Sequence, residues 1–228
     1  MNRKLFGFIL NLFVSLAVTV GIILAFVNAT SEGFSHFGQR LLYFTTLSNI
    51  WIGITCFVIV ILQIVEKIKN KTLIKNYIYV LKYIFTISIT VTGIVFCVLL
   101  APFADFNVWT TSSILTHVVV PVTAVISYFV EEPLNPMNQK YIWFSLIPPF
   151  VYFVFGSILS LLKVDFGRGQ TYPYFFMNFD SEVGLFGFRN EGLFEMGCIY
   201  WIIVILLFIL GISKLYYNLH SINKKNEK

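Results

Sequence analysis

Charged residues are scarce in this chain of 228 residues, at 12%, whereas 57% of the residues are apolar. Soluble domains carry about 25% charged residues, so a soluble globular protein is excluded. The composition instead fits a lipid bilayer. Because a crossing helix takes about 20 residues, six crossings would use most of the chain and leave no room for a separate soluble domain.

Sequence motifs for metal or nucleotide chemistry are also missing. The chain has no CxxC, HExxH, Walker loop or GxGxxG. Its three cysteines, Cys56, Cys97 and Cys198, lie in apolar runs, where a thiol behaves as a small hydrophobe. We therefore expect no metal and no organic cofactor. The net charge of +5 is spread over loop ends without interleaved aromatics, so nucleic acid is not an expected partner.

Six apolar runs are long enough to cross a bilayer. The first run follows Arg3 and Lys4 as a signal peptide would, but it is far longer than the ~7–15 residues of a signal core, so we expect a retained span. The sequence predicts an all-α polytopic membrane protein with one six-helix transmembrane domain over residues 1–228. The expected spans lie near residues 5–27, 41–65, 77–100, 112–130, 141–163 and 196–215.

The basic residues predict the orientation. If both termini are cytoplasmic, only Arg40, Lys163, Arg168 and Arg189 lie outside, which leaves 16 − 4 = 12 basic residues inside. The connection 66–76 alone carries four lysines, as the positive-inside rule favours. We therefore expect an N-in, C-in topology. The abundance of Phe, Ile, Lys and Asn is typical of an AT-rich genome and suggests a bacterial plasma membrane.

One connection, residues 164–195, is much longer than the others and is rich in glycine and phenylalanine. Loops beyond about 12–15 residues are usually functional or disordered, and this one is too aromatic for disorder. We expect it to cover the outer mouth of the bundle, with Tyr172, Pro173 and Tyr174 pointing inward. The alternative is a re-entrant or interfacial segment among the headgroups.

Polar residues inside the spans follow helical spacing. Thr45, Asn49 and Cys56 share one face of the second run, and Lys82, Thr86 and Thr90 follow a similar stripe in the third. Small and polar stripes are a usual means of packing membrane helices, so most of these residues are expected to be structural.

His117 is the only histidine inside a span. An ionisable residue at this depth indicates either a functional site or an interhelical hydrogen bond, and the sequence leaves both open. Pro121, four residues on, removes one backbone hydrogen bond and allows the helix to open there. By helical rise, Thr45 lies roughly 6 Å and His117 roughly 7 Å below the start of its span on the same side. A hydroxyl and an imidazole at matching depth are the minimum for a base-activated nucleophile, although Thr46, Ser48 and Ser113 lie at similar heights.

Three short motifs resemble a known family: Tyr43-Phe44-Thr45, His117 with Pro121, and Thr171-Tyr172-Pro173-Tyr174. In this order along the chain they are similar to the androgen-induced six-span membrane proteins and their bacterial relatives. Ser127 stands where bacterial relatives often have an aspartate. The resemblance implies a threonine hydrolase that cleaves fatty acid esters of hydroxy fatty acids, with Thr45 as nucleophile and His117 as general base.

The function expected from the sequence is intramembrane hydrolysis of a lipid ester that enters from the outer leaflet. Membrane lipids are thus the expected partners, and an oxyanion donor could come from Asn49 or Tyr172. The alternative is a transporter or lipid-binding membrane protein without catalytic activity, in which Lys82, Thr86 and Thr90 line a pathway. A structural or assembly role without a ligand is a third hypothesis.

Overall fold

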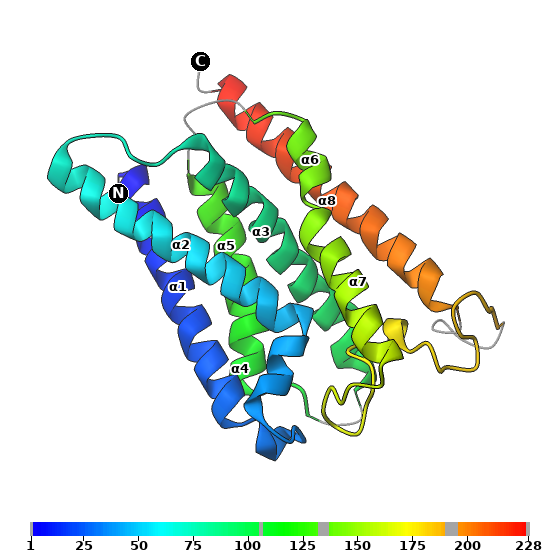
Figure 1. Ribbon diagram of the computed structural model, residues 1–228. Coiled ribbons are helices and arrows are strands. Elements are labelled where there is room, and N and C mark those ends of the chain that lie inside the picture. Colours follow the sequence, from blue (N-terminus) through cyan, green and yellow to red (C-terminus); the bar gives the residue numbers. More distant parts are fainter. Residues whose placement is uncertain (1, 105–106, 132–136, 190–195, 227–228) are drawn as a thin grey trace.

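The computed structural model describes residues 2–104, 107–131, 137–189 and 196–226 (Figure 1). Within these ranges the chain is helical and has no β-strand; the one isolated bridge pairs Phe188 with Met196. The predicted all-α fold with six helices capable of crossing a membrane is confirmed. The spans are Arg3–Val27, Phe44–Lys69, Asn76–Phe103, Thr111–Val130, Lys140–Leu161 and Cys198–Ser221.

Several spans are built from more than one helical segment. The α-helices are α1 (Arg3–Val27), α2 (Phe44–Lys69), α3 (Asn76–Val95), α4 (Thr111–Ile114), α5 (Val120–Val130), α6 (Lys140–Phe144), α7 (Ile147–Leu161) and α8 (Cys198–Asn226). Two π-helical segments, Phe96–Leu100 and Leu115–Val119, continue α3 and join α4 to α5. Short 3-10 turns cover Thr30–Glu32, Phe37–Leu42, Ala101–Phe103 and Phe175–Met177.

The helix boundaries differ from the sequence expectation at two places that matter for the site. The second span begins at Phe44 instead of 41, because Phe37–Leu42 forms a 3-10 helix. The fifth span is interrupted between α6 and α7, and Pro148 and Pro149 occupy the first turn of α7. Proline is tolerated there because the first-turn N–H groups of a helix have no helical partner.

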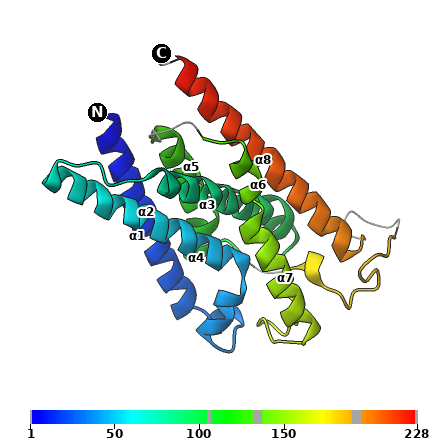
Figure 2. The same cartoon turned by 45° about the horizontal axis from the view of Figure 1, so that its top comes forward.

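The two termini lie at the same end of the bundle (Figures 1 and 2). We call this the termini end and the opposite one the loop end. The loop end carries the described parts of the connections 28–43, 104–110 and 162–197; residues 105–106, 132–136 and 190–195 are outside the described ranges. Which end faces the cytoplasm stays a prediction from the basic residues.

Cysteine labelling tests that orientation. Single cysteines at Thr72 and Gln170, both exposed, would be introduced into a variant without the three native cysteines and probed on intact cells with an impermeant maleimide. Thr72 is preferable to Asn70, whose φ of 50° favours asparagine or glycine. With the loop end outside, Gln170→Cys should react and Thr72→Cys should react only after lysis. The reverse pattern would invert the topology.

Four spans form the tightly packed part of the bundle. α1 packs against α2 and α5, and α3 packs against α2 and α5, around small or branched side chains such as Val14, Ile52 and Ala124. A Cβ on Gly53 of α2 would lie 2.7 Å from the Val18 side chain of α1, so glycine permits this close approach. The α6–α7 span and α8 lie on the other side of α3 and share an aromatic core with it.

The described part of the long connection folds back onto the loop end. Phe166 is fully buried, and its carbonyl oxygen accepts a 3.1 Å hydrogen bond from the Tyr43 hydroxyl. The Arg168 amide donates a 2.7 Å hydrogen bond to the Gly33 carbonyl oxygen. Farther on, Met177 is fully buried among α7 and its neighbours. Two connections far apart in sequence therefore pack together beside the start of α2.

Candidate functional site

Thr45 is the second residue of α2, where backbone N–H groups have no helical acceptor. Its amide instead donates a 3.2 Å hydrogen bond to the Tyr174 hydroxyl from the long connection. Thr45 also lines a small cavity of about 40 Å³ together with Pro149, Tyr152 and Tyr174. The residue predicted as nucleophile therefore borders a small space between α2, α3, α7, α8 and the long connection.

The hydroxyl of Tyr174 contacts Thr45. Tyr172, two residues earlier, is the tyrosine predicted from the sequence as a possible oxyanion donor. Burial raises the pKa of the Tyr174 phenol, while contacts with the amide and side chain of Thr45 lower it by less. The phenol therefore stays protonated at neutral pH and keeps a proton to donate. Within the described residues no hydrogen bond joins Tyr172 to Thr45, so an oxyanion role for Tyr172 stays a prediction without contact support.

His117 lies in the π-helical segment Leu115–Val119, and the local sequence explains that geometry. Pro121 has no N–H to offer the His117 carbonyl oxygen four residues earlier, so the regular helical ladder cannot close there. π-Helical segments are rare and occur frequently at functional sites. The segment therefore marks His117 as the part of this span where helix geometry departs from the regular form.

The tautomer of His117 follows from its neighbours. Nδ1 lies 2.9 Å from the Ser113 carbonyl oxygen and 3.1 Å from the Thr116 hydroxyl oxygen. A carbonyl oxygen can only accept, so Nδ1 carries the proton, and the Thr116 hydroxyl is free to accept because it donates to the Ser112 carbonyl oxygen at 2.8 Å. In the neutral ring Nε2 then holds a lone pair, which is the state that a general base requires.

Close packing holds the His117 segment on two sides. The Phe96 ring stacks on the imidazole, with 3.8 Å between ring centroids. A Cβ on Gly93 would lie 2.8 Å from the His117 carbonyl oxygen, and one on Gly21 would lie 2.9 Å from the Thr116 side chain. α1 and α3 therefore approach this backbone as closely as glycine allows.

Adding a methyl group at Gly93 should consequently loosen the site. The new Cβ would meet backbone, which cannot move aside as a side chain can, so Gly93→Ala should destabilise the protein by about 1–3 kcal/mol. Gly211→Ala in α8 is the matched control: nothing lies within 4 Å of its Cβ position. It should be neutral or gain up to ~1 kcal/mol from helix propensity. Thermal unfolding in detergent compares them, and equal midpoints would contradict the close-packing argument.

Asn49 connects the Thr45 turn to the His117 segment. Its side-chain nitrogen donates to the Thr45 carbonyl oxygen at 2.8 Å and to the Thr116 carbonyl oxygen at 3.1 Å. Both amide hydrogens are thereby engaged, and Oδ1 is buried without a hydrogen-bond partner among the described residues. Asn49 thus fixes α2 against the backbone next to His117, whereas its predicted oxyanion role stays a prediction.

The structure brings three predicted residues into one region through backbone contacts. Asn49 links the backbone of Thr45 to that of Thr116, the neighbour of His117, but no hydrogen bond joins the Thr45 hydroxyl to the imidazole within the described ranges. Catalytic hydrogen bonds are often long before substrate binds, so geometry without substrate does not exclude the pair. Sequence reasoning missed Phe96, which carried no signal, and passed over Tyr174 although it belonged to a motif already singled out.

A second polar cluster lies nearer the termini end and involves Lys82, expected to line a pathway in a transporter. Lys82 Nζ lies 2.8 Å from Glu131 Oε2 and also donates to Asn11 Oδ1 at 2.7 Å and Ser127 Oγ at 2.8 Å. The Asn11 amide donates to the other Glu131 oxygen. Two ammonium hydrogens are thus donated to Asn11 and Ser127, and the charge is paired with Glu131, so the fully buried ammonium is held between α1 and the α5 segment.

Metal ligands do not cluster in the described part of the chain: no three His, Cys, Asp or Glu side chains there are grouped so as to hold an ion. Comparison with protein-family models, curated proteins and solved structures found no match. The case for a function therefore rests on the residues and contacts of this chain and on the resemblance of its short motifs.

Proposed function

We propose that this membrane protein is an intramembrane hydrolase of lipid esters, with Thr45 as nucleophile and His117 as general base. The observation that carries the proposal is the Asn49 side chain, which joins the carbonyl oxygens of Thr45 and Thr116 and so links the two reacting segments. The Nδ1–H tautomer of His117 supports it, because Nε2 is left as the basic nitrogen. The fatty acid esters of hydroxy fatty acids cleaved by the family that the motifs resemble are the first substrates to test.

In this mechanism the Thr45 hydroxyl oxygen attacks the ester carbonyl carbon as His117 Nε2 takes its proton. The tetrahedral intermediate collapses, the proton passes from Nε2 to the departing alcohol oxygen, and the acyl group stays on Thr45. Water then attacks the acyl carbonyl carbon as Nε2 takes one of its protons. The bond to the Thr45 oxygen breaks, that oxygen takes the proton from Nε2, and the fatty acid is released. The Tyr174 phenol, which lies against Thr45, is a candidate oxyanion donor beside Tyr172, because both amide hydrogens of Asn49 are already donated to carbonyl oxygens.

Covalent labelling tests the nucleophile directly. The purified protein would be treated with an alkyl fluorophosphonate, and the modified peptide identified by mass spectrometry. We expect a phosphonyl group on Thr45, displacing fluoride, and no labelling in Thr45→Val, which keeps the shape of the side chain. Thr46→Val, one residue on and buried, is the matched control and should label normally. Labelling that persists in Thr45→Val would assign the reaction to another residue.

A lipid-binding protein without catalysis is the second candidate. The observation that favours it is an open apolar groove of about 520 Å³ between α2, α3 and the α6–α7 span. Lys82 argues against the transport variant of this hypothesis, because its ammonium group is fully buried and is held by Glu131, Asn11 and Ser127 instead of lining an open pathway. Saturable uptake of a labelled lipid by proteoliposomes would favour transport over hydrolysis.

A further inference from the structure

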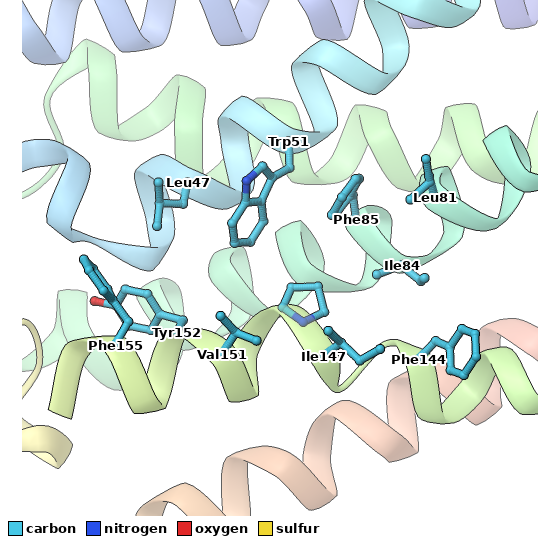
Figure 3. Close-up of a pocket in the computed structure, with 11 residues that line it drawn as sticks. Leu47, Trp51, Leu81, Ile84, Phe85, Phe144, Ile147, Val151, Tyr152 and Phe155 are labelled. Atoms are coloured by element: carbon cyan, nitrogen blue, oxygen red, sulfur yellow. The ribbon is translucent and has the colours of Figure 1, made fainter. Parts of the chain in front are cut away.

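The apolar groove between α2, α3 and the α6–α7 span has a volume of about 520 Å³ (Figure 3). Leu47 and Trp51 of α2 and Phe85 of α3 form one wall, and Ile147, Val151 and Tyr152 of α7 face them. Tyr152 supplies the only side-chain hydroxyl among the lining residues. Such a lining offers a ligand hydrocarbon contacts and almost nothing else.

Helix packing explains why the groove exists. α7 packs mainly against α8 and the turn Phe175–Met177, and less extensively against α2 and α3. The large rings of Trp51 and Phe85, with centroids 5.7 Å apart, line the α2–α3 wall of the resulting gap. Val151, at 58% exposed, and Phe144, at 41%, line its open side. Because these helices cross the bilayer, the open side faces lipid hydrocarbon, not water.

The length of the groove matches one leaflet. Its lining on the fifth span runs from Phe144 to Phe155, which is 155 − 144 = 11 residues or about 16 Å at 1.5 Å per residue. The hydrocarbon core is about 30 Å thick, so the groove covers about half of it. A single acyl chain about as long as one leaflet is thick therefore fits along the groove.

The groove adjoins the candidate site through Tyr152. This side chain lines both the groove and the small cavity that contains Thr45. Its hydroxyl donates a 2.9 Å hydrogen bond to the Leu42 carbonyl oxygen, which holds the ring between the two spaces. Tyr152 is therefore a shared wall, and one end of a chain lying in the groove is next to the cavity that Thr45 lines.

We propose that this groove binds a single linear acyl chain, which enters sideways from the bilayer and presents its carboxyl end toward Thr45. The inference rests on the proposed function for the ester, but binding of the chain needs no catalysis. Substrates would then be selected by the length and linearity of the acyl chain and not by the headgroup, because the lining provides no charge that could contact a headgroup.

Photo-crosslinking tests the binding. The purified protein in detergent would be irradiated with palmitic acid carrying a mid-chain diazirine and a terminal alkyne, with increasing unlabelled palmitate as competitor. Val151→Trp should fill the groove and abolish the competed labelling. Val154→Trp is the matched control: it puts the same new ring on the same helix at a lipid-exposed residue (48% exposed) that does not line the groove. This variant should label like the unmodified protein.

The outcomes separate the groove from the chemistry. Thr45→Ala should retain competed labelling, with cross-links mapped to α2, α3 and α7, even though it is expected to lose hydrolysis. Labelling that palmitate does not compete, or that Val151→Trp and Val154→Trp change equally, would overturn the groove as a binding site. Competed labelling in a protein that hydrolyses no ester would keep the groove and reject the hydrolase. Unfolding midpoints of both tryptophan variants would show that each is folded.

Discussion

Alanine at His117 is expected to lower the rate of ester hydrolysis by about 10²–10⁴-fold, the usual contribution of a positioned general base. Alanine at Thr45 should abolish the acyl-enzyme route altogether, because no other oxygen takes its place. A free threonine hydroxyl is a weak nucleophile and gains reactivity only as a base removes its proton. The double variant should therefore be no slower than the slower single variant, as expected for groups that act as a unit.

The control for this experiment is Thr46→Ala, which removes a neighbouring buried hydroxyl and should retain most of the activity. Purified variants would be compared on a panel of lipid and nitrophenyl esters after size-exclusion chromatography has shown equal folding. Multiplicative losses in the double variant would mean that Thr45 and His117 contribute independently. Hydrolysis by the unmodified protein no faster than by Thr45→Ala would remove the support for the proposed mechanism.

The fold was largely predictable because bilayer thickness imposes a length on every apolar run. The interruption of the fifth span lies between α6 and α7, next to Pro148 and Pro149 in the first turn of α7. The start of α2 was missed by three residues, since apolar content alone does not distinguish the 3-10 helix Phe37–Leu42 from the span that follows it. Orientation depends on basic residues and a membrane, so the helix packing does not test it.

The candidate site was predictable only in part, because its contacts join residues far apart in sequence. Thr45 and His117 could be chosen from residue type and depth. The contact of Tyr174 with Thr45 depends on how a long connection folds back, and no spacing rule gives that. Asn49 was predicted as an oxyanion donor because its amide lies one turn from Thr45. In the structure that amide instead donates a hydrogen bond to the Thr116 carbonyl oxygen of another span.

Lys82, nearer the termini end, is a second case in which a contact between residues far apart in sequence could not be predicted. Lys82 could be singled out in the sequence because it lies inside the third span. Glu131 could not, because it follows the last residue of α5 and its sequence context is typical of a solvated loop residue. The structure buries both side chains, at 1% and 7% exposed, and joins them. A charge that suggested a pathway in the sequence is therefore one half of an interhelical ion pair.

Breaking that ion pair should have the largest effect on stability of any single change considered for this protein. Lys82→Met leaves the Glu131 carboxylate buried without its ammonium partner, and removing one member of a buried pair typically costs about 3–5 kcal/mol. Glu131→Met leaves the ammonium with neutral partners only and should cost a similar amount. Denaturation of the purified protein in detergent would measure both.

The double variant distinguishes a strongly coupled pair from two independent contributors. Replacing both charges by methionine leaves no unpaired charge, so Lys82→Met with Glu131→Met should be more stable than either single variant. Lys163→Met provides the exposed control: its partner Asp180 and Lys163 itself are both more than half exposed, so the loss should be within about 1 kcal/mol. If the two single losses at Lys82 and Glu131 simply add, the charges do not depend on each other, and Asn11 and Ser127 must stabilise each of them separately.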